Sequence, residues 1–135
     1  MRKNSNGASK ISKGAGKIYI VEDDQFSINF YTNRLVDEGY EILSSPEADT
    51  AFRQIKKDQP DLIIVDLMIQ GGNGFDLIGK IRKEKGFKKT PIIVLSNLGQ
   101  DKDVQEAIKK GANKYFVKAN TQFAEIEKAI KELIK

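Results

Sequence analysis

The 135-residue chain contains no cysteine and no histidine. Without cysteine it can form no disulfide, no thiolate metal site and no thiol nucleophile. Without histidine it has no histidine general base, no zinc site of the usual kind and no phosphohistidine of its own. Oxygen ligands and lysines are therefore the groups on which any site chemistry has to rest.

Long hydrophobic runs are also missing. No apolar run approaches the ~18 residues of a membrane helix. The basic amino terminus is followed by glycine, serine and asparagine, and not by the apolar core of a signal peptide. Hydrophobic residues make up 39% of the chain and charged residues 31%, which at this length indicates one globular domain. We therefore expect a cytoplasmic protein without membrane contact.

The net charge of +4 is unevenly distributed. Five of the 23 cations lie in residues 1–17, and all 19 acidic residues follow them, so the remaining chain is close to neutral. The five cations are Arg2, Lys3, Lys10, Lys13 and Lys17. This stretch lacks apolar periodicity, which predicts a disordered basic extension over residues 1–16 and a folded domain over residues 17–135. No aromatic residue is interleaved with its charges, so we expect no direct contact with nucleic acid.

Short apolar runs alternate with amphipathic segments through the rest of the chain. The runs that predict strands are residues 18–21, 40–43, 62–65, 92–95 and 115–117. The run at 62–65 has no alternation, which is typical of a strand buried on both faces. Apolar residues at helical spacing predict five helices that follow these strands. The pattern predicts an α/β fold, with a doubly wound five-stranded parallel sheet and helices on both faces.

Local signals predict where some of the helices begin and end. Ser45, which precedes a proline, is expected to cap the second helix, and Thr121 is expected to cap the last one. Gly111 is expected to end the fourth helix. The buried stripe of that helix is expected to consist of Val104, Ala107 and Ile108.

Polar side chains follow four of the five predicted strands, and they are Glu22, Asp23, Asp66, Ser96 and Lys118. Taken singly, each has an ordinary explanation as a turn residue, a cap or a solvated lysine. The carboxyl ends of parallel strands meet at one edge of a sheet, so we expect all of these side chains to lie together. Three neighbouring carboxylates repel one another and require a cation. Because only oxygen ligands are present, the predicted cation is Mg²⁺.

This arrangement predicts phosphoryl chemistry. A carboxylate held beside Mg²⁺ can act as a nucleophile on phosphorus and form an aspartyl phosphate. The oxygens of the transferring phosphoryl group need positive charge and hydrogen-bond donors, which the Lys118 ammonium and the Ser96 hydroxyl can supply. Asp66 is the predicted nucleophile, because it joins the end of the buried strand to the metal ligands and the lysine.

The order and spacing of four motifs resemble the receiver domain of bacterial response regulators. These motifs are ValGluAspAsp at 21–24, AspLeuMet at 66–68 with a glycine eight residues after Asp66, LeuSer at 95–96 and GlyAlaAsnLysTyrPheValLys at 111–118. The resemblance implies a flavodoxin-like sheet with strand order 2-1-3-4-5. It also implies that Asp66 is the phosphoacceptor.

The resemblance further implies roles for the residues around Asp66. Mg²⁺ would be bound by Asp23, Asp66 and the backbone carbonyl of Met68, with Glu22 placing a metal-bound water. Ser96 and Lys118 would contact the phosphoryl group. Ser96 and Tyr115 would change conformation with phosphorylation, although Tyr115 taken alone reads as an aromatic residue that covers the core.

The implied function is that of a single-domain response regulator. A sensor histidine kinase or a histidine phosphotransfer protein would donate the phosphoryl group, and the chain would catalyse only its own phosphorylation and dephosphorylation. The signal would leave through a protein bound at the fourth helix, fifth strand and fifth helix, with the chain a monomer or a weak phosphorylation-dependent dimer. One alternative is a receiver-like interaction module that does not switch. A flavin or nucleotide binder of the same topology is disfavoured, because the acidic residues after the first strand repel phosphate.

Three positions depart from the usual pattern of the family. Gln70 and Ala119 stand where proline is common, and Asn97 stands where a small residue is common. We expect Asn97 to restrict access to the phosphorylation site. We expect a trans peptide between Lys118 and Ala119, since a cis bond without proline costs about 2.5 to 4 kcal/mol.

Overall fold

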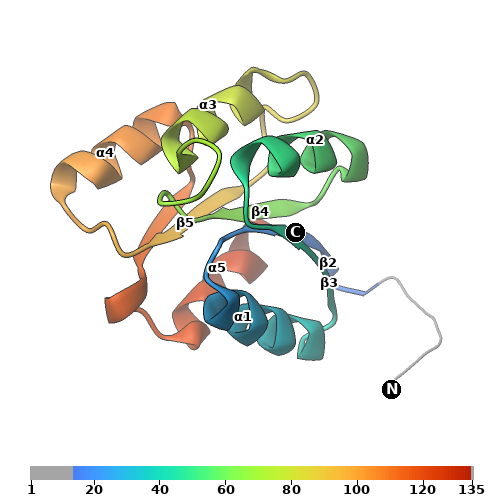
Figure 1. The fold of residues 1–135 in the computed structure, drawn as a ribbon. Coiled ribbons are helices and arrows are strands. Elements are labelled where there is room, and N and C mark those ends of the chain that lie inside the picture. Colours follow the sequence, from blue (N-terminus) through green and yellow to red (C-terminus); the bar gives the residue numbers. More distant parts are fainter. Residues whose placement is uncertain (1–13, 135) are drawn as a thin grey trace.

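A computed structural model describes residues 14–134, so residues 1–13 of the predicted extension and Lys135 lie outside the described residues. The strands are β2 (Gly16–Val21), β3 (Tyr40–Ser45), β4 (Leu62–Val65), β5 (Ile92–Ser96) and β6 (Lys114–Val117). The helices are α1 (Gln25–Asp37), α2 (Ala48–Asp58), α3 (Gly74–Lys83), α4 (Asp101–Lys110) and α5 (Phe123–Leu133), with a 3₁₀ turn η1 (Lys118–Asn120) after β6. The predicted alternation of strands and helices is confirmed (Figure 1).

All five strands form one parallel sheet in the order β3-β2-β4-β5-β6. In chain order this is the second, first, third, fourth and fifth strand, which confirms the predicted flavodoxin-like topology. The strand order reverses between β2 and β4, whose registers place Val21 beside Val65. The crevice outside such a reversal is where open α/β sheets bind ligands.

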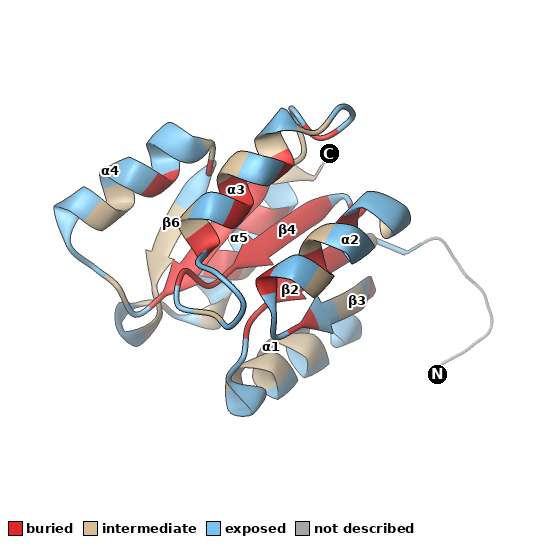
Figure 2. Cartoon of the chain, turned by 45° about the horizontal axis from the view of Figure 1, so that its top comes forward, coloured by how far each residue is buried: buried red, intermediate tan, exposed pale blue. Residues whose placement is uncertain are grey.

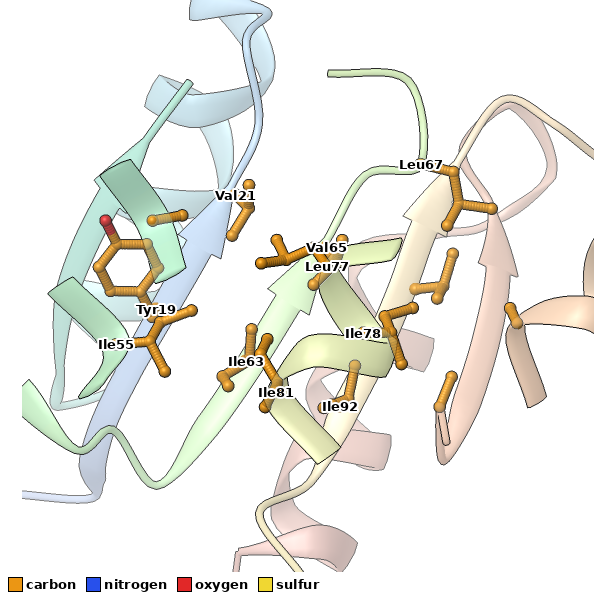
Figure 3. Close-up of a cluster of buried hydrophobic side chains, with 14 of the residues drawn as sticks. Tyr19, Val21, Ile55, Ile63, Val65, Leu67, Leu77, Ile78, Ile81 and Ile92 are labelled. Carbon is orange, nitrogen blue, oxygen red and sulfur yellow. The ribbon is translucent and has the colours of Figure 1, made fainter. Parts of the chain in front are cut away.

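The central strand β4 is buried on both faces, as its unbroken apolar run predicts (Figure 2). Ile63 and Val65 pack against α2, α3 and α4 in one cluster, part of which Figure 3 shows. Leu62 and Ile64 pack against α1 and α5 on the other face. Because successive strand residues point to opposite faces, one apolar run serves both cores.

Both predicted N-caps are wrong. Ser45 is the last residue of β3, paired with Val21 in the ladder, and α2 begins only at Ala48 with Glu47 as its N-cap. Thr121 donates its hydroxyl to the Val117 carbonyl at 2.7 Å, so the next residue, a glutamine, caps α5. The backbone of Ser45 is held in the strand ladder, whereas the side chain of Thr121 is used by a turn hydrogen bond in place of the helix cap.

The buried stripe predicted for α4 is also wrong in part. Ala107 is fully buried, but the side chain of Ile108 is 46% exposed, and Val104 is only half buried. Gly111 is the C-cap of the helix with φ near +126°, which confirms the predicted end. The helix therefore rests on the molecule over a narrow line. None of the helices in the described part of the chain is long and apolar enough to cross a membrane.

Candidate functional site

The carboxylates at the ends of β2 and β4 meet at one lysine. The Lys118 ammonium donates to Asp66 Oδ2 at 3.0 Å and also binds Glu22 Oε1. Glu22 and Asp66 are buried, and the side chain of Lys118 is only 14% exposed. Three of the five predicted site residues are therefore brought together in one water-poor cluster.

Backbone N–H groups orient both carboxylates. The N–H of Asp66 donates to the Val21 carbonyl at 2.9 Å, which extends the sheet ladder one residue beyond β4. Asp66 Oδ1 accepts from the N–H of Met68 at 3.1 Å. Glu22 Oε2 accepts from the N–H of Asp24 at 3.0 Å. Each buried carboxylate thus has a backbone donor in addition to Lys118, which fixes its orientation.

Burial and charge act against each other in this cluster. Burial alone would lower the pKa of Lys118, but its hydrogen bonds to Glu22 and Asp66 outweigh burial and raise that pKa above its ordinary value. Burial raises the pKa of Glu22, and the hydrogen bond from Lys118 offsets only part of that effect. The ammonium is therefore held firmly in its charged form beside Asp66.

Asp23 differs from the two buried acids, because it is exposed. No three acidic side chains of the described residues converge into a ready-made metal cluster. Even so, two buried carboxylates, Glu22 and Asp66, share a single ammonium, and the exposed Asp23 directly follows Glu22, so negative charge is in excess at these strand ends. All of the donors are hard oxygens, which suits Mg²⁺, an ion that keeps several waters and takes one or two protein carboxylates. The residues present fit that ion.

Ser96 and Tyr115 both bind the loop between β5 and α4. Ser96 is fully buried at the end of β5, and its Oγ accepts from the N–H of Leu98 at 3.3 Å. The Tyr115 hydroxyl donates to the carbonyl of the same Leu98 at 2.5 Å. Burial, followed by the nearby Asp103 and Asp66, raises the pKa of Tyr115 to about 12, so this hydroxyl remains a donor. The two residues predicted to switch therefore both bind the backbone of one residue, Leu98.

Asn97 is exposed on the same loop and directly follows Ser96. Its side chain makes no hydrogen bond within residues 14–134. No cis peptide bond occurs among these residues, so the predicted trans bond between Lys118 and Ala119 is confirmed. Ala119 lies in η1.

One feature of the site was missed from the sequence, and a second was indicated there by a glycine. The first is the pairing of Lys118 with Glu22, which requires the long lysine side chain to reach from β6 past two strands to β2. The second is the role of Gly74 after Asp66. A Cβ on Gly74 would lie 2.6 Å from Leu67 Cα and 2.7 Å from the Asp66 carbonyl oxygen, so only glycine lets the loop return against the strand. The spacing of eight residues between Asp66 and Gly74 carried that signal.

Comparison with known proteins identifies the family. Residues 18–131 match the model of the response regulator receiver domain. The chain belongs to this family. It is 31% identical over 119 residues to the two-component response regulator PhoP of Pseudomonas aeruginosa, covering 88% of this chain and 52% of that protein. The receiver therefore spans about half the length of that relative.

Solved receiver structures share the fold. A putative response regulator from Chloroflexus aurantiacus superposes with a TM-score of 0.83 at 27% identity, covering 88% of this chain and 97% of that one. The receiver domain of the sensor histidine kinase PA1611 from Pseudomonas aeruginosa superposes with a TM-score of 0.81 at 23% identity, covering 88% and 97%. That domain holds a magnesium ion in its active-site cleft.

Proposed function

We propose that this receiver accepts a phosphoryl group on Asp66 from the phosphohistidine of a sensor kinase or a histidine phosphotransfer protein. The observation that carries the proposal is the Lys118 ammonium bound to both Asp66 and Glu22 at the strand-order reversal. Glu22 and Asp66 both combine burial, a backbone donor and the lysine, and Asp66 is assigned as the acceptor because it directly follows the central strand β4 in the AspLeuMet motif. Asp23 remains exposed and is assigned to the metal instead.

The proposed step is a transfer between two nucleophiles. A carboxylate oxygen of Asp66 forms a bond to phosphorus while the bond from phosphorus to the donor's imidazole nitrogen breaks, and the imidazole leaves with that electron pair. Lys118 stays charged beside the phosphoryl oxygens, with Glu22 holding its other side. Ser96 supplies a hydroxyl donor from the end of β5. These groups stabilise the charge that develops on the phosphoryl oxygens.

The proposed ligands of Mg²⁺ are Asp23, Asp66 and the Met68 carbonyl, with Glu22 orienting a metal-bound water. When bound, the ion neutralises charge on the carboxylates and on the phosphoryl oxygens. The excess of carboxylates over ammonium groups supports this assignment. So does the exposed position of Asp23, which allows an ion to keep part of its water shell.

The proposed output is a change in the loop between β5 and α4. A phosphoryl group on Asp66 would draw the Ser96 hydroxyl toward it and weaken the bond that Ser96 makes with Leu98. Because the Tyr115 hydroxyl holds the same Leu98, that change would reach β6 and α4. We propose that a downstream protein binds the α4, β6 and α5 face and responds to this change.

Phosphorylation by a small donor tests the function. The chain is incubated with acetyl phosphate, with and without Mg²⁺, and its intact mass is measured. The proposal expects one added phosphoryl group that depends on Mg²⁺. A mass that never changes would reject phosphoacceptance and favour an interaction module that no longer reacts. If the chain is labelled but the amide signals of α4, β6 and α5 in its NMR spectrum do not change, the result would favour a module that reacts but does not switch.

A further inference from the structure

Arg82, near the end of α3, is the most heavily hydrogen-bonded side chain far from Asp66. Its Nη1 donates to the carbonyls of Phe87 and Thr90 at 2.8 and 2.7 Å. Its Nε and Nη2 donate to the carbonyl of Gly111 at 3.0 and 2.8 Å, and Nη2 also donates to Asn113 Oδ1 at 2.9 Å. All the N–H groups of the guanidinium are used, and none contacts a carboxylate.

These bonds fasten the end of α4. Gly111 is the C-cap of that helix, and its N–H donates back to the carbonyls of Ala107 and Ile108 at 3.1 and 3.0 Å. A Cβ on Gly111 would lie 2.5 Å from Arg82 Cγ, so the two residues are in close contact. The guanidinium thus satisfies a helix-terminal carbonyl that would otherwise need water or another donor.

The same clamp fixes the starts of two site-bearing strands. Asn113 Oδ1 accepts from the N–H of Ile92, and the N–H of Asn113 donates to the Ile92 carbonyl, both at 2.8 Å. Arg82 therefore joins the C-terminal ends of α3 and α4 to the first residues of β5 and β6 as one unit. Loops that meet at a single guanidinium cannot move independently without breaking its bonds.

The other end of α4 is held much more weakly. The only fully buried residue of the helix is Ala107, in its last turn, and residues 101–106 include none. The loop before the helix is tied to the core by the bonds of Leu98 to Ser96 and Tyr115. Segments with few buried apolar contacts are those that open at low free-energy cost. The first turns of α4 are therefore freer to move than its last turn.

We propose that Arg82 is a positioning residue that makes α4 pivot about Gly111 when the receiver is phosphorylated. The inference rests on the proposed function, since it describes how the change at Ser96 becomes a directed movement of the signalling face. The clamp keeps the last turn of α4 in place. The first turns and the 97–100 loop swing, so a local change at the site becomes a rotation of the helix.

A purely structural role would give a different result. A clamp that stabilises every state equally raises stability but leaves the response to phosphorylation unchanged. A pivot shapes the response itself. The two roles are therefore distinguished by comparing which residues respond to phosphorylation with and without the clamp. A measurement of stability alone does not distinguish them.

Amide hydrogen exchange of the full chain in Mg²⁺, with and without beryllofluoride as the phosphoryl mimic, makes this comparison. In the parent, beryllofluoride should change exchange at residues 97–104 and leave 107–113 unaltered. In Arg82→Met the change should spread to 107–113, where exchange becomes about tenfold faster. Arg82→Lys keeps the charge but not the planar set of donors, and should resemble Arg82→Met. Arg53→Met, on the exposed surface of α2, is the matched control and should behave like the parent.

The outcomes separate the two proposals. If the parent does not respond to beryllofluoride at any residue, the proposed function fails and the pivot falls with it. If the parent responds and Arg82→Met exchanges faster overall but keeps the parent's pattern of response, only the pivot is overturned. Should Arg82→Met not fold, Asn113→Ala removes one acceptor of the guanidinium and is expected to spread the response in the same direction, by a smaller amount. An unaltered pattern in that variant counts against the pivot.

Discussion

The Lys118 ammonium lies 3.0 Å from Asp66 Oδ2 while it also binds Glu22, so one cation joins the strand ends of β2, β4 and β6. The contact is largely shielded from water, where an ion pair is stronger than at the surface. It holds positive charge in the place where a phosphoryl group on Asp66 would put its oxygens. The reactivity of Asp66 should depend on this contact.

Replacing Lys118 should impair labelling more than folding. In Lys118→Met, labelling by acetyl phosphate and Mg²⁺ is expected to slow by about a hundredfold, the loss typical when a preorganised donor is removed. Mg²⁺ should bind more tightly, because the cation that competes for Glu22 and Asp66 is gone. Lys128→Met, on the exposed side of α5, is the control. Parent-like labelling of Lys118→Met would show that the ammonium takes no part in the transfer.

The same ion pair predicts a pH dependence of stability. The pKa of Lys118 is raised from 10.5 in the folded chain, so its stabilising effect is complete below that pH and is lost as the pH rises through the folded value. Asp24 and Tyr31 also face this ammonium. Tyrosines with raised pKa values, among them Tyr19 at about 12, also make the folded chain less stable as the pH rises. They remain in Lys118→Met, so comparison with that variant isolates the lysine.

Urea unfolding at several values between about pH 10 and pH 12 measures this effect. The parent should be the more stable protein at the lower end of the range. The difference in free energy of unfolding between the parent and Lys118→Met should narrow as the pH rises. A constant difference across the range would contradict the assigned role of the ion pair.

Two glycines of α3 give a matched pair of substitutions. Gly74→Ala forces a Cβ against backbone atoms of Leu67 and Asp66, which cannot yield as a side chain would, and is expected to cost about 2 kcal/mol of stability. Gly79→Ala meets only the flexible Lys110 side chain, at 3.6 Å, and should stabilise the helix by about 0.5 to 1 kcal/mol. Urea denaturation checks both values. Equal effects of the two substitutions would refute the close packing inferred at Gly74.

Much of this fold could be predicted because its signals are local. The unbroken apolar run of β4 and the carboxylate that ends it identify the central strand and the edge where the site lies. Gly111 ends α4 because it adopts a positive φ, which glycine accommodates without strain. In such cases one short stretch of sequence contains the whole physical cause.

The wrong or missing predictions concern residues whose environment depends on segments distant in the sequence. Ser45 has the chemistry of a helix cap, but the ladder with β2 extends β3 to include it. Ile108 has the right spacing to be buried, but α4 sits on the sheet over too narrow a line to cover it. The pairing of Lys118 with Glu22 depends on strand order and side-chain reach together, which no local pattern encodes.

Asn97 should act as a gate to the site. It is exposed and directly follows Ser96, and we expect its amide to crowd the approach to Asp66. In Asn97→Ala, labelling by acetyl phosphate and the later loss of label are both expected to be faster, because donor and attacking water reach Asp66 more easily. Asn33→Ala, on the exposed side of α1, is the control. Unchanged or slower rates in both assays would mean that the amide turns away into solvent.

The central claim is that Asp66 is the phosphorylated residue. The most direct measurement is peptide mass mapping of the chain after reaction with acetyl phosphate and Mg²⁺, run in parallel on Asp66→Asn and on the control Asp24→Asn. The label should map to the peptide that contains Asp66, be retained in Asp24→Asn and be absent from Asp66→Asn. Equal labelling of Asp66→Asn and the parent would contradict the assignment and place the reaction on another residue.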